Sequence, residues 1–237
     1  MSPPRTLNDV HSLAVSVLRY GRGLVALRPL DEPDQPLELW EFEACPFCRK
    51  VREALSELDL PYVSRACAKG SNNRAAVLAR GGQRQFPFLV DPNTQRELYE
   101  SEDIVDYLHE TYGGGRRRPR LDKLIAPLNT LTSALASAAR PGRGRKVRAG
   151  CEDREQPPEL LVLYSFEASP YCRKVRERLH ELNLDALVIN LAKKSPHRPQ
   201  LVARGGKMQV PYLIDPNTGT ELYESDDIVA YLDATYG

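Results

Sequence analysis

The chain has 237 residues, of which 41% are hydrophobic and 27% are charged, and its formal net charge is +1. These values are ordinary for a globular protein, and so small a net charge provides no field that would attract nucleic acid or a membrane surface. The apolar runs are too short for a membrane-spanning helix. There are five cysteines, an odd number that argues against a disulfide framework, so we expect a cytoplasmic protein with a reactive thiol.

An internal repeat organises the chain. Residues 37–113 align with residues 161–237 without a gap, and more than half of the aligned positions are identical. Such similarity indicates duplication of one domain. The sequence Gly-Arg-Gly, at 21–23 and again at 142–144, extends the similarity upstream of each copy. We therefore expect four segments: a partly helical leader (1–36), unit one (37–113), a basic linker with a helix (114–160) and unit two (161–237).

Both units predict the same order of elements. In unit one these are a strand at 37–42, a helix at 46–60, a strand at 62–66, a helix at 72–80, two strands within 86–100 and a helix at 101–112. Ser101 is the predicted N-cap of the last helix. In the helix at 46–60, the apolar residues follow one face and the charged residues the other. The order β-α-β-α-β-β-α predicts an α/β fold in which each unit has a mixed four-stranded sheet.

A pair of cysteines, Cys45 and Cys48, lies where the first helix of unit one begins. The free N–H groups and the dipole of a helix N-terminus stabilise a thiolate, which is the nucleophile in disulfide exchange. Cys48, one turn later, can then attack the resulting mixed disulfide. A structural pair and half of a zinc site are the alternatives, although a second Cys-x-x-Cys is lacking and the histidines are scattered.

Unit two carries Ser169 in place of the first cysteine and keeps Cys172. A hydroxyl cannot form a disulfide, so unit two cannot perform the exchange predicted for unit one. Of the other cysteines, Cys67 aligns with Leu191 and is predicted to be buried in an apolar site. Cys151 lies in a charged stretch and is expected to be exposed.

Proline follows Phe86 and Val210 at the start of the third strand of each unit, as Pro87 and Pro211. Proline within a sheet is expected at the first residue of a strand or on an edge. A cis bond here would present the backbone of the preceding residue to a bound peptide-like thiol. A simple turn proline is the alternative.

A Glu-Ser pair precedes the last helix of each unit, at Glu100-Ser101 and Glu224-Ser225. A helix N-terminus can bind a carboxylate, and a neighbouring acid can pair with an ammonium group. The pair could therefore hold the head of an α-amino acid, although a helix cap alone also explains the serine.

Together these motifs resemble glutaredoxins and the N-terminal, glutathione-binding domain of glutathione S-transferases. The stretch 166–176, FEASPYCRKVR, is similar to the Ser-Pro-Tyr/Phe-Cys stretch of several transferase classes. The tandem arrangement resembles a plant and bacterial family of duplicated transferase N-domain proteins. The resemblance covers both units and implies two tandem thioredoxin-like domains, with glutathione as co-substrate.

By position, the resemblance implies that Cys45 is the nucleophile and Cys48 the resolving thiol. It further implies a glutathione site in unit one made by Phe86, Pro87, Glu100 and Ser101. In unit two the matching residues are Ser169, Val210, Pro211, Glu224 and Ser225.

Two departures from these families limit the functions expected. Glu43 precedes the first cysteine where glutaredoxins usually have a basic residue, and an acid there should oppose a low thiol pKa. Full transferases add a large helical domain, which the 114–160 segment is too short to supply and which does not follow Gly237 here.

We therefore favour a glutathione-dependent thiol-disulfide oxidoreductase acting on a disulfide substrate, with unit two glutathione-binding or structural. The alternatives are a glutathione transferase-like protein, or a scaffold that binds glutathione or an iron–sulfur cluster. No other metal is expected, and the two units are expected to form an intramolecular pseudo-dimer.

Overall fold

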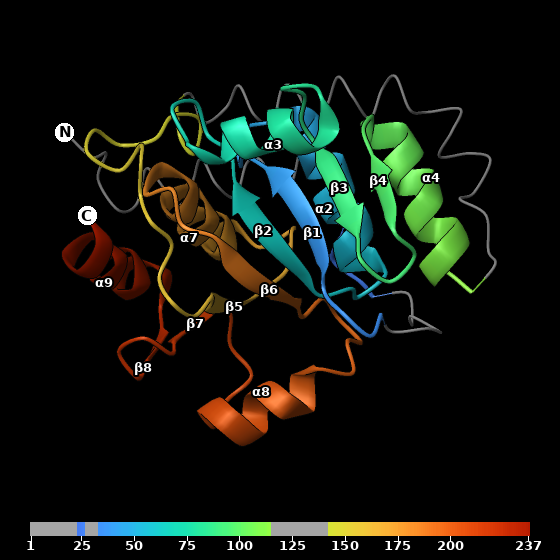
Figure 1. Cartoon of the computed structure of the whole chain (residues 1–237). Helices are drawn as coiled ribbons and strands as arrows, with labels where there is room; N and C mark the ends of the chain where they lie inside the picture. Colours follow the sequence, from blue (N-terminus) through green and yellow to red (C-terminus); the bar gives the residue numbers. More distant parts are fainter. Residues whose placement is uncertain (1–22, 27–32, 115–141) are drawn as a thin grey trace.

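The computed structural model describes residues 23–26, 33–114 and 142–237. The helices predicted in the leader and in the basic linker fall outside these ranges. Within them, the predicted order of elements occurs twice (Figure 1). Unit one comprises β1 (Leu37–Glu41), α2 (Pro46–Glu57), β2 (Tyr62–Ala66), α3 (Asn73–Gly81), β3 (Phe88–Asp91), β4 (Arg96–Leu98) and α4 (Ser101–Tyr112). Unit two comprises β5 (Leu161–Ser165), α7 (Pro170–Glu181), β6 (Ala186–Asn190), α8 (Arg198–Gly205), β7 (Tyr212–Asp215), β8 (Thr220–Tyr223) and α9 (Ser225–Tyr236).

The sheet confirms the predicted fold class. In unit one, β1 pairs in parallel with β2 and antiparallel with β3, and β3 pairs antiparallel with β4. Unit two repeats this pattern with β5, β6, β7 and β8. Each unit is therefore an α/β domain with a mixed four-stranded sheet, as two tandem thioredoxin-like domains require.

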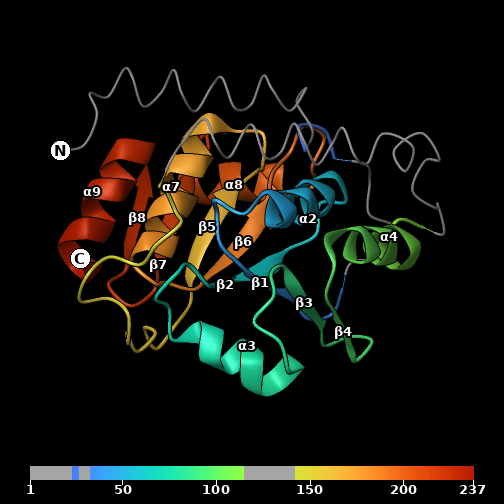
Figure 2. The ribbon, with the colours of Figure 1, turned by 90° about the horizontal axis from the view of Figure 1, so that it is seen from above.

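The two units share one sheet. β2 and β6 pair antiparallel through Tyr62–Val188, Val63–Leu187 and Ser64–Ala186, which gives the strand order β4-β3-β1-β2-β6-β5-β7-β8. An antiparallel pair of this kind is related by a twofold axis perpendicular to the sheet, so corresponding helices lie on the same face. Figure 2 shows α9, α7, α2 and α4 in a row along one face, with α3 on the other. The two units are thus joined by one continuous sheet.

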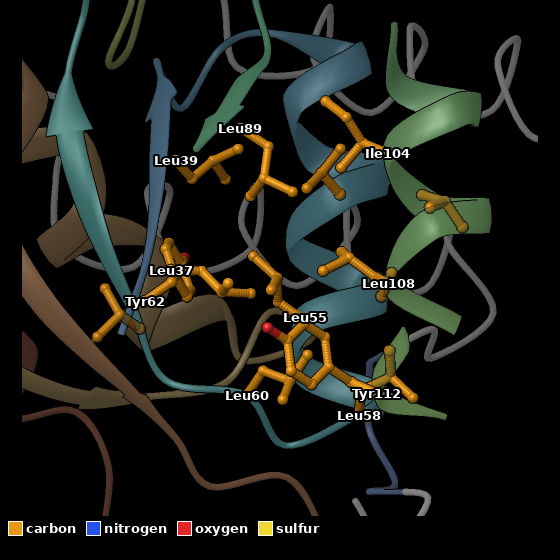
Figure 3. Packing of buried hydrophobic residues seen from close by; sticks show 14 residues of the cluster. Leu37, Leu39, Leu55, Leu58, Leu60, Tyr62, Leu89, Ile104, Leu108 and Tyr112 are labelled. Atoms are coloured by element: carbon orange, nitrogen blue, oxygen red, sulfur yellow. The ribbon is translucent and has the colours of Figure 1, made fainter. Parts of the chain in front are cut away.

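Alternating strand residues supply the cores on the two faces of the sheet. Leu37 and Leu39 of β1 point toward Leu55 of α2 and Leu108 of α4, in the cluster shown in Figure 3. Trp40 points the other way and packs with residues of α3 and β3. Val188 of β6 joins the first cluster, so the core of unit one includes a residue of unit two.

Two short segments cross from one unit to the other, and we call them the exchanged segments (24–26 and 145–147). The first precedes unit one but pairs with unit two: Ala26 N–H donates to the carbonyl of Lys193 at 2.8 Å. The second precedes unit two but pairs with unit one: Lys69 N–H donates to the carbonyl of Arg145, also at 2.8 Å. The upstream Gly-Arg-Gly similarity therefore reflects a structural repeat.

The last glycine of each Gly-Arg-Gly lets these segments pass close to the other unit. Gly144 has a φ of +62°, and a Cβ on it would lie 2.8 Å from the Cβ of Glu43. Gly23 has a φ of +73°, and a Cβ on it would lie 3.2 Å from the Cβ of Glu167. Downstream of Gly144, Cys151 packs into the core of unit two and is 3% exposed, so the expectation of an exposed Cys151 was wrong. Cys67 is buried, as predicted.

Charged side chains fill the space between α2 and α7, and we call this cluster the charged seam. It consists of Glu41, Glu43, Arg49, Arg52, Glu167, Arg173 and Arg176, each at most 4% exposed. Arg52 donates to Glu167 at 2.9 Å and Arg176 donates to Glu43 at 3.0 Å, so the two central ion pairs join opposite units. The charged face predicted for the helix at 46–60 is thus buried rather than solvated, because α7 covers it.

The seam is stable only if its buried charges remain paired. Burial opposes ionisation of Arg52, but Glu167 and Glu41 hold the pKa of its guanidinium well above the usual range. Burial likewise opposes ionisation of Glu167, yet Arg176 and Arg52 hold the pKa of its carboxyl below the usual range. Removing one member of such a buried pair leaves an uncompensated charge, which costs about 3–5 kcal/mol.

We predict that Arg52→Met lowers the free energy of unfolding by about 3–5 kcal/mol, because it removes the arginine that pairs with buried Glu41 and one of the arginines that pair with Glu43 and Glu167. Arg80→Ala is the matched control, since the ion pair of Arg80 with Glu97 is exposed and should contribute less than about 1 kcal/mol. Urea denaturation of both variants tests this. Equal losses would contradict a structural role for the seam.

A second prediction concerns pH. His180 of α7 is buried beside Ser64 of β2, and burial lowers its pKa to about 4. The unfolded chain, with a histidine pKa of about 6.5, takes up this proton first, so the stability from neutral His180 is present above pH 6.5 and is lost as the pH falls toward 4. The full loss is about 3 kcal/mol. The difference in unfolding free energy between wild type and His180→Gln, measured from pH 7 to 4, should show this loss; a constant difference would refute it.

Candidate functional site

The dithiol motif lies in the turn between β1 and α2. Cys45 is the N-cap of α2, with φ −74° and ψ 120°, and Pro46 is the first residue of the helix. The N–H of Cys48 donates to Sγ of Cys45 at 3.3 Å, and Cys45 N–H donates to the carbonyl of Phe42 at 3.0 Å. Cys45 therefore stands at the helix N-terminus, as predicted. Its side chain is 4% exposed, and that of Cys48 is fully buried.

The two thiols have opposite ionisation properties. A hydrogen bond from the Cys48 thiol lowers the pKa of Cys45, and backbone N–H groups and the charge of Arg52 add to this, although burial opposes it. Burial raises the pKa of Cys48 well above its usual range, and its bond to Cys45 raises it further. Cys45 is thus the thiol that gives up its proton first, while Cys48 keeps one to donate.

Glu43 does not stand against the thiol as an isolated acid. Its carboxylate is 3.0 Å from Nε of Arg176 and 3.2 Å from a terminal nitrogen of Arg52. These arginines hold the pKa of Glu43 well below its usual range despite burial. The acid that the sequence placed before Cys45 is therefore compensated by a residue of the other unit.

The Phe86–Pro87 bond is cis, and an arginine that sequence reasoning missed covers it. The guanidinium of Arg74 lies 4.9 Å from the ring centre of Phe86, and its Nε donates to the carbonyl of Cys67 at 2.9 Å. Arg74 also lies within electrostatic reach of Cys45 and Cys48. The available signal was repetition, since unit two has arginine at the same position.

The Glu-Ser pair is arranged differently from our prediction. Glu100, not Ser101, is the N-cap of α4, and Ser101 is the first residue of the helix. Because Glu100, with φ +63°, occupies the N-cap position, Ser101 lies one position further into the helix, and it is 4% exposed. The Glu100 carboxylate accepts a hydrogen bond from Gln85, so the pair is linked to the residue that precedes Phe86. A non-glycine residue at positive φ is costly and often marks a functional site.

Unit two repeats this geometry with a hydroxyl in place of the thiol. Ser169 is the N-cap of α7, and its Oγ accepts from Cys172 N–H at 3.2 Å. The Val210–Pro211 bond is also cis. Glu224 has φ +64° and accepts from Gln209 at 2.5 Å, with Ser225 as the first residue of α9. Apart from the sulfur, the predicted residues of unit two thus lie as they do in unit one.

The comparison with protein families agrees with this geometry. Residues 39–116 and 163–237 match the family described as glutathione S-transferase, N-terminal domain, and together they make up more than half of the chain. The chain belongs to this family. Both transferase N-terminal domains contain a motif turn, a cis proline and a Glu-Ser pair.

Among solved structures, the trimeric glutathione transferase TDR1 of Leishmania is similar to this chain, with 15% sequence identity and a TM-score of 0.30. The alignment covers 86% of this chain and 67% of that one. This similarity is too weak to support any inference about the present protein. No curated protein matches the chain.

The motif turns of the two transferase N-terminal domains lie at opposite ends of the strands of the sheet. β1 runs parallel to β2, β2 antiparallel to β6, and β6 parallel to β5. Strands β1 and β5 therefore run in opposite directions. The turns that follow them lie beyond opposite ends of the sheet's strands. The two motif turns therefore do not contribute to one shared site.

An exposed aromatic residue lies beside each motif. Phe47 is 46% exposed and Tyr171, at the same position in unit two, is 50% exposed.

Within the described ranges, no cluster of histidine, cysteine, aspartate or glutamate is suited to hold a metal ion. Among the same residues, no helix has the length and apolar character needed to cross a membrane.

We predict that iodoacetamide alkylates Cys45 at a lower pH than Cys48 and Cys67. The reason is that the thiolate reacts, and the pKa values of Cys48 and Cys67 are raised by burial. Cys48→Ala removes the thiol donor and should move the midpoint of Cys45 alkylation to higher pH, while Cys48→Ser keeps a donor and should move it less. Peptide mass spectrometry across a pH series measures this. Identical profiles for both variants would exclude the hydrogen bond as the cause.

Proposed function

We propose that this protein is a glutathione-dependent thiol-disulfide oxidoreductase that acts through Cys45 and Cys48. The observation that carries the proposal is the geometry of the motif turn. Cys45 caps a helix and accepts hydrogen bonds that stabilise its thiolate, while buried Cys48 keeps its proton one turn away. A nucleophile and a resolving thiol need these opposite properties.

The chemistry is a sequence of thiol-disulfide exchanges. The Cys45 thiolate attacks one sulfur of the substrate disulfide, and the departing thiolate takes up a proton. Cys48 then loses its proton and attacks the Cys45 sulfur, which forms the Cys45–Cys48 disulfide and releases the second thiol. Two glutathione molecules restore the dithiol and leave as glutathione disulfide. The substrate thus gains the two electrons that the two glutathiones lose.

Family membership supports glutathione as the thiol that binds in this site. We place its cysteine against the backbone of Phe86, beside Pro87. The γ-glutamyl end would reach Glu100 and the N-terminus of α4 at Ser101, where a carboxylate finds free N–H groups. Because the thiols must stay reduced between turnovers, we propose a cytoplasmic location.

For unit two we propose glutathione binding without covalent exchange, at Ser169, Val210, Pro211, Glu224 and Ser225. A serine hydroxyl can donate to a bound thiolate but cannot form a mixed disulfide. A purely structural role for unit two is the alternative, and measurement of glutathione binding by Ser169→Ala and wild type separates the two.

We expect the wild type to catalyse glutathione-coupled reduction of a small mixed disulfide, because the thiolate of Cys45 is stabilised. Cys45→Ser should abolish this activity, whereas Ser169→Cys should leave the activity of unit one intact, since unit two has its own, separate motif turn. The rate of glutathione disulfide formation measures all three proteins. A wild type without activity, or a Cys45→Ser variant that retains it, would refute the proposed function.

A further inference from the structure

Side chains of unit two hold the loop that precedes Cys45. Glu43, two residues before Cys45, is 1% exposed, and its carboxylate forms the 3.0 Å contact with Arg176 of α7. Arg176 also lies 2.7 Å from Glu167, in the corresponding loop of unit two. The loop of each unit is therefore fixed to the same arginine.

Arg52 completes this arrangement from the other side. It belongs to α2, the helix that Cys45 caps, and it donates to the backbone carbonyl of Glu43 at 3.3 Å. It also donates to Oε2 of Glu167 at 2.9 Å. The loop before Cys45 and the helix after it are thus both tied to unit two through buried, charge-assisted hydrogen bonds, which are the strongest kind.

We propose that unit two is the positioning partner of the Cys45 site, with Arg176 and Glu167 fixing the loop and the helix that meet at this thiol. The proposal rests on the proposed function only in taking Cys45 as the reacting thiol. Arg176 and Glu167 act through Glu43 and Arg52, so they are positioning residues rather than catalytic ones.

The arrangement has an electrostatic consequence that packing alone does not have. A carboxylate two residues from Cys45 disfavours a thiolate there unless a positive charge compensates it. Arg176 supplies that charge. The ionisable groups around Glu43 are Glu41 of β1, Arg49 and Arg52 of α2, Glu167, and Arg173, Arg176 and His180 of α7. Loss of Arg176 should therefore move ionisation of Cys45 to higher pH.

The test measures the alkylation rate of Cys45 by iodoacetamide across pH in the full chain, followed by mass spectrometry of the peptide that contains Cys45. Arg176→Met should raise the midpoint by about one pH unit, which lowers the rate near neutral pH by about tenfold. In Glu43→Gln/Arg176→Met both charges are absent, and the midpoint should return toward the wild-type value. Glu43→Gln alone removes the carboxylate nearest to Cys45 while Arg176 stays charged beside Glu167, and it should lower the midpoint, so the test remains available if Arg176→Met does not fold.

Val188→Ala is the control, because it shortens a buried side chain at the β2–β6 junction without touching the charged seam. If Arg176→Met shifts the midpoint no more than Val188→Ala does, and Glu43→Gln does not lower it, unit two is only a packing partner and the proposal is wrong. Disulfide reduction is measured separately on the same proteins. A wild type that reduces no disulfide, combined with the expected shifts, would refute the proposed function and leave the positioning role intact.

Discussion

The structure depends on the mutual compensation of charges buried between α2 and α7. Arginine and glutamate are costly to bury, and they are tolerated here because each has an ion-pair partner in the seam, in several cases from the other unit. Arg52 needs Glu167, and Glu43 needs Arg176. The β2–β6 pairing and the exchanged segments bring the units to the distance at which these pairs form. Apolar contacts alone would tolerate several relative positions of the two units. Buried ion pairs require one relative position, because each charge must lie within reach of its partner.

The same constraint connects the fold to the candidate chemistry. A motif turn at a helix N-terminus stabilises a thiolate wherever it occurs, but this turn begins with an acid at Glu43. Within unit one, Arg52 compensates that acid and adds a positive charge that lowers the pKa of Cys45. In the fused sheet, Arg176 adds a second and larger compensation. The departure from the glutaredoxin pattern is thus offset by arginines of both units.

Much of the fold was predictable because local patterns determine it. The strand-forming run at 37–41 carries its own signal in the sequence, as do the glycines at 81–82, where α3 ends, and the residues at 91–94, which form the turn between β3 and β4. The burial of the charged face of α2 was not predictable. Periodicity shows that Arg49 and Arg52 share a face of the helix, but it does not show what covers that face. The placement of Glu100 rather than Ser101 as the N-cap depends on a positive φ, which residue type does not reveal for glutamate. Arg74 was missed for a similar reason, since stacking on Phe86 is a tertiary contact.

The difference between the two motif turns follows from the same energetics. Oγ of Ser169 accepts the N–H of Cys172 at 3.2 Å, almost as Sγ of Cys45 accepts that of Cys48 at 3.3 Å. Serine is also a good N-cap, so α7 keeps its start and the sheet is unaffected by loss of the thiol. Loss of Glu167 or Arg176 would instead leave buried charges unpaired in both units. Replacement of the first thiol of unit two by a hydroxyl therefore keeps the cap of α7, and under the proposed function it removes only the exchange chemistry of unit two.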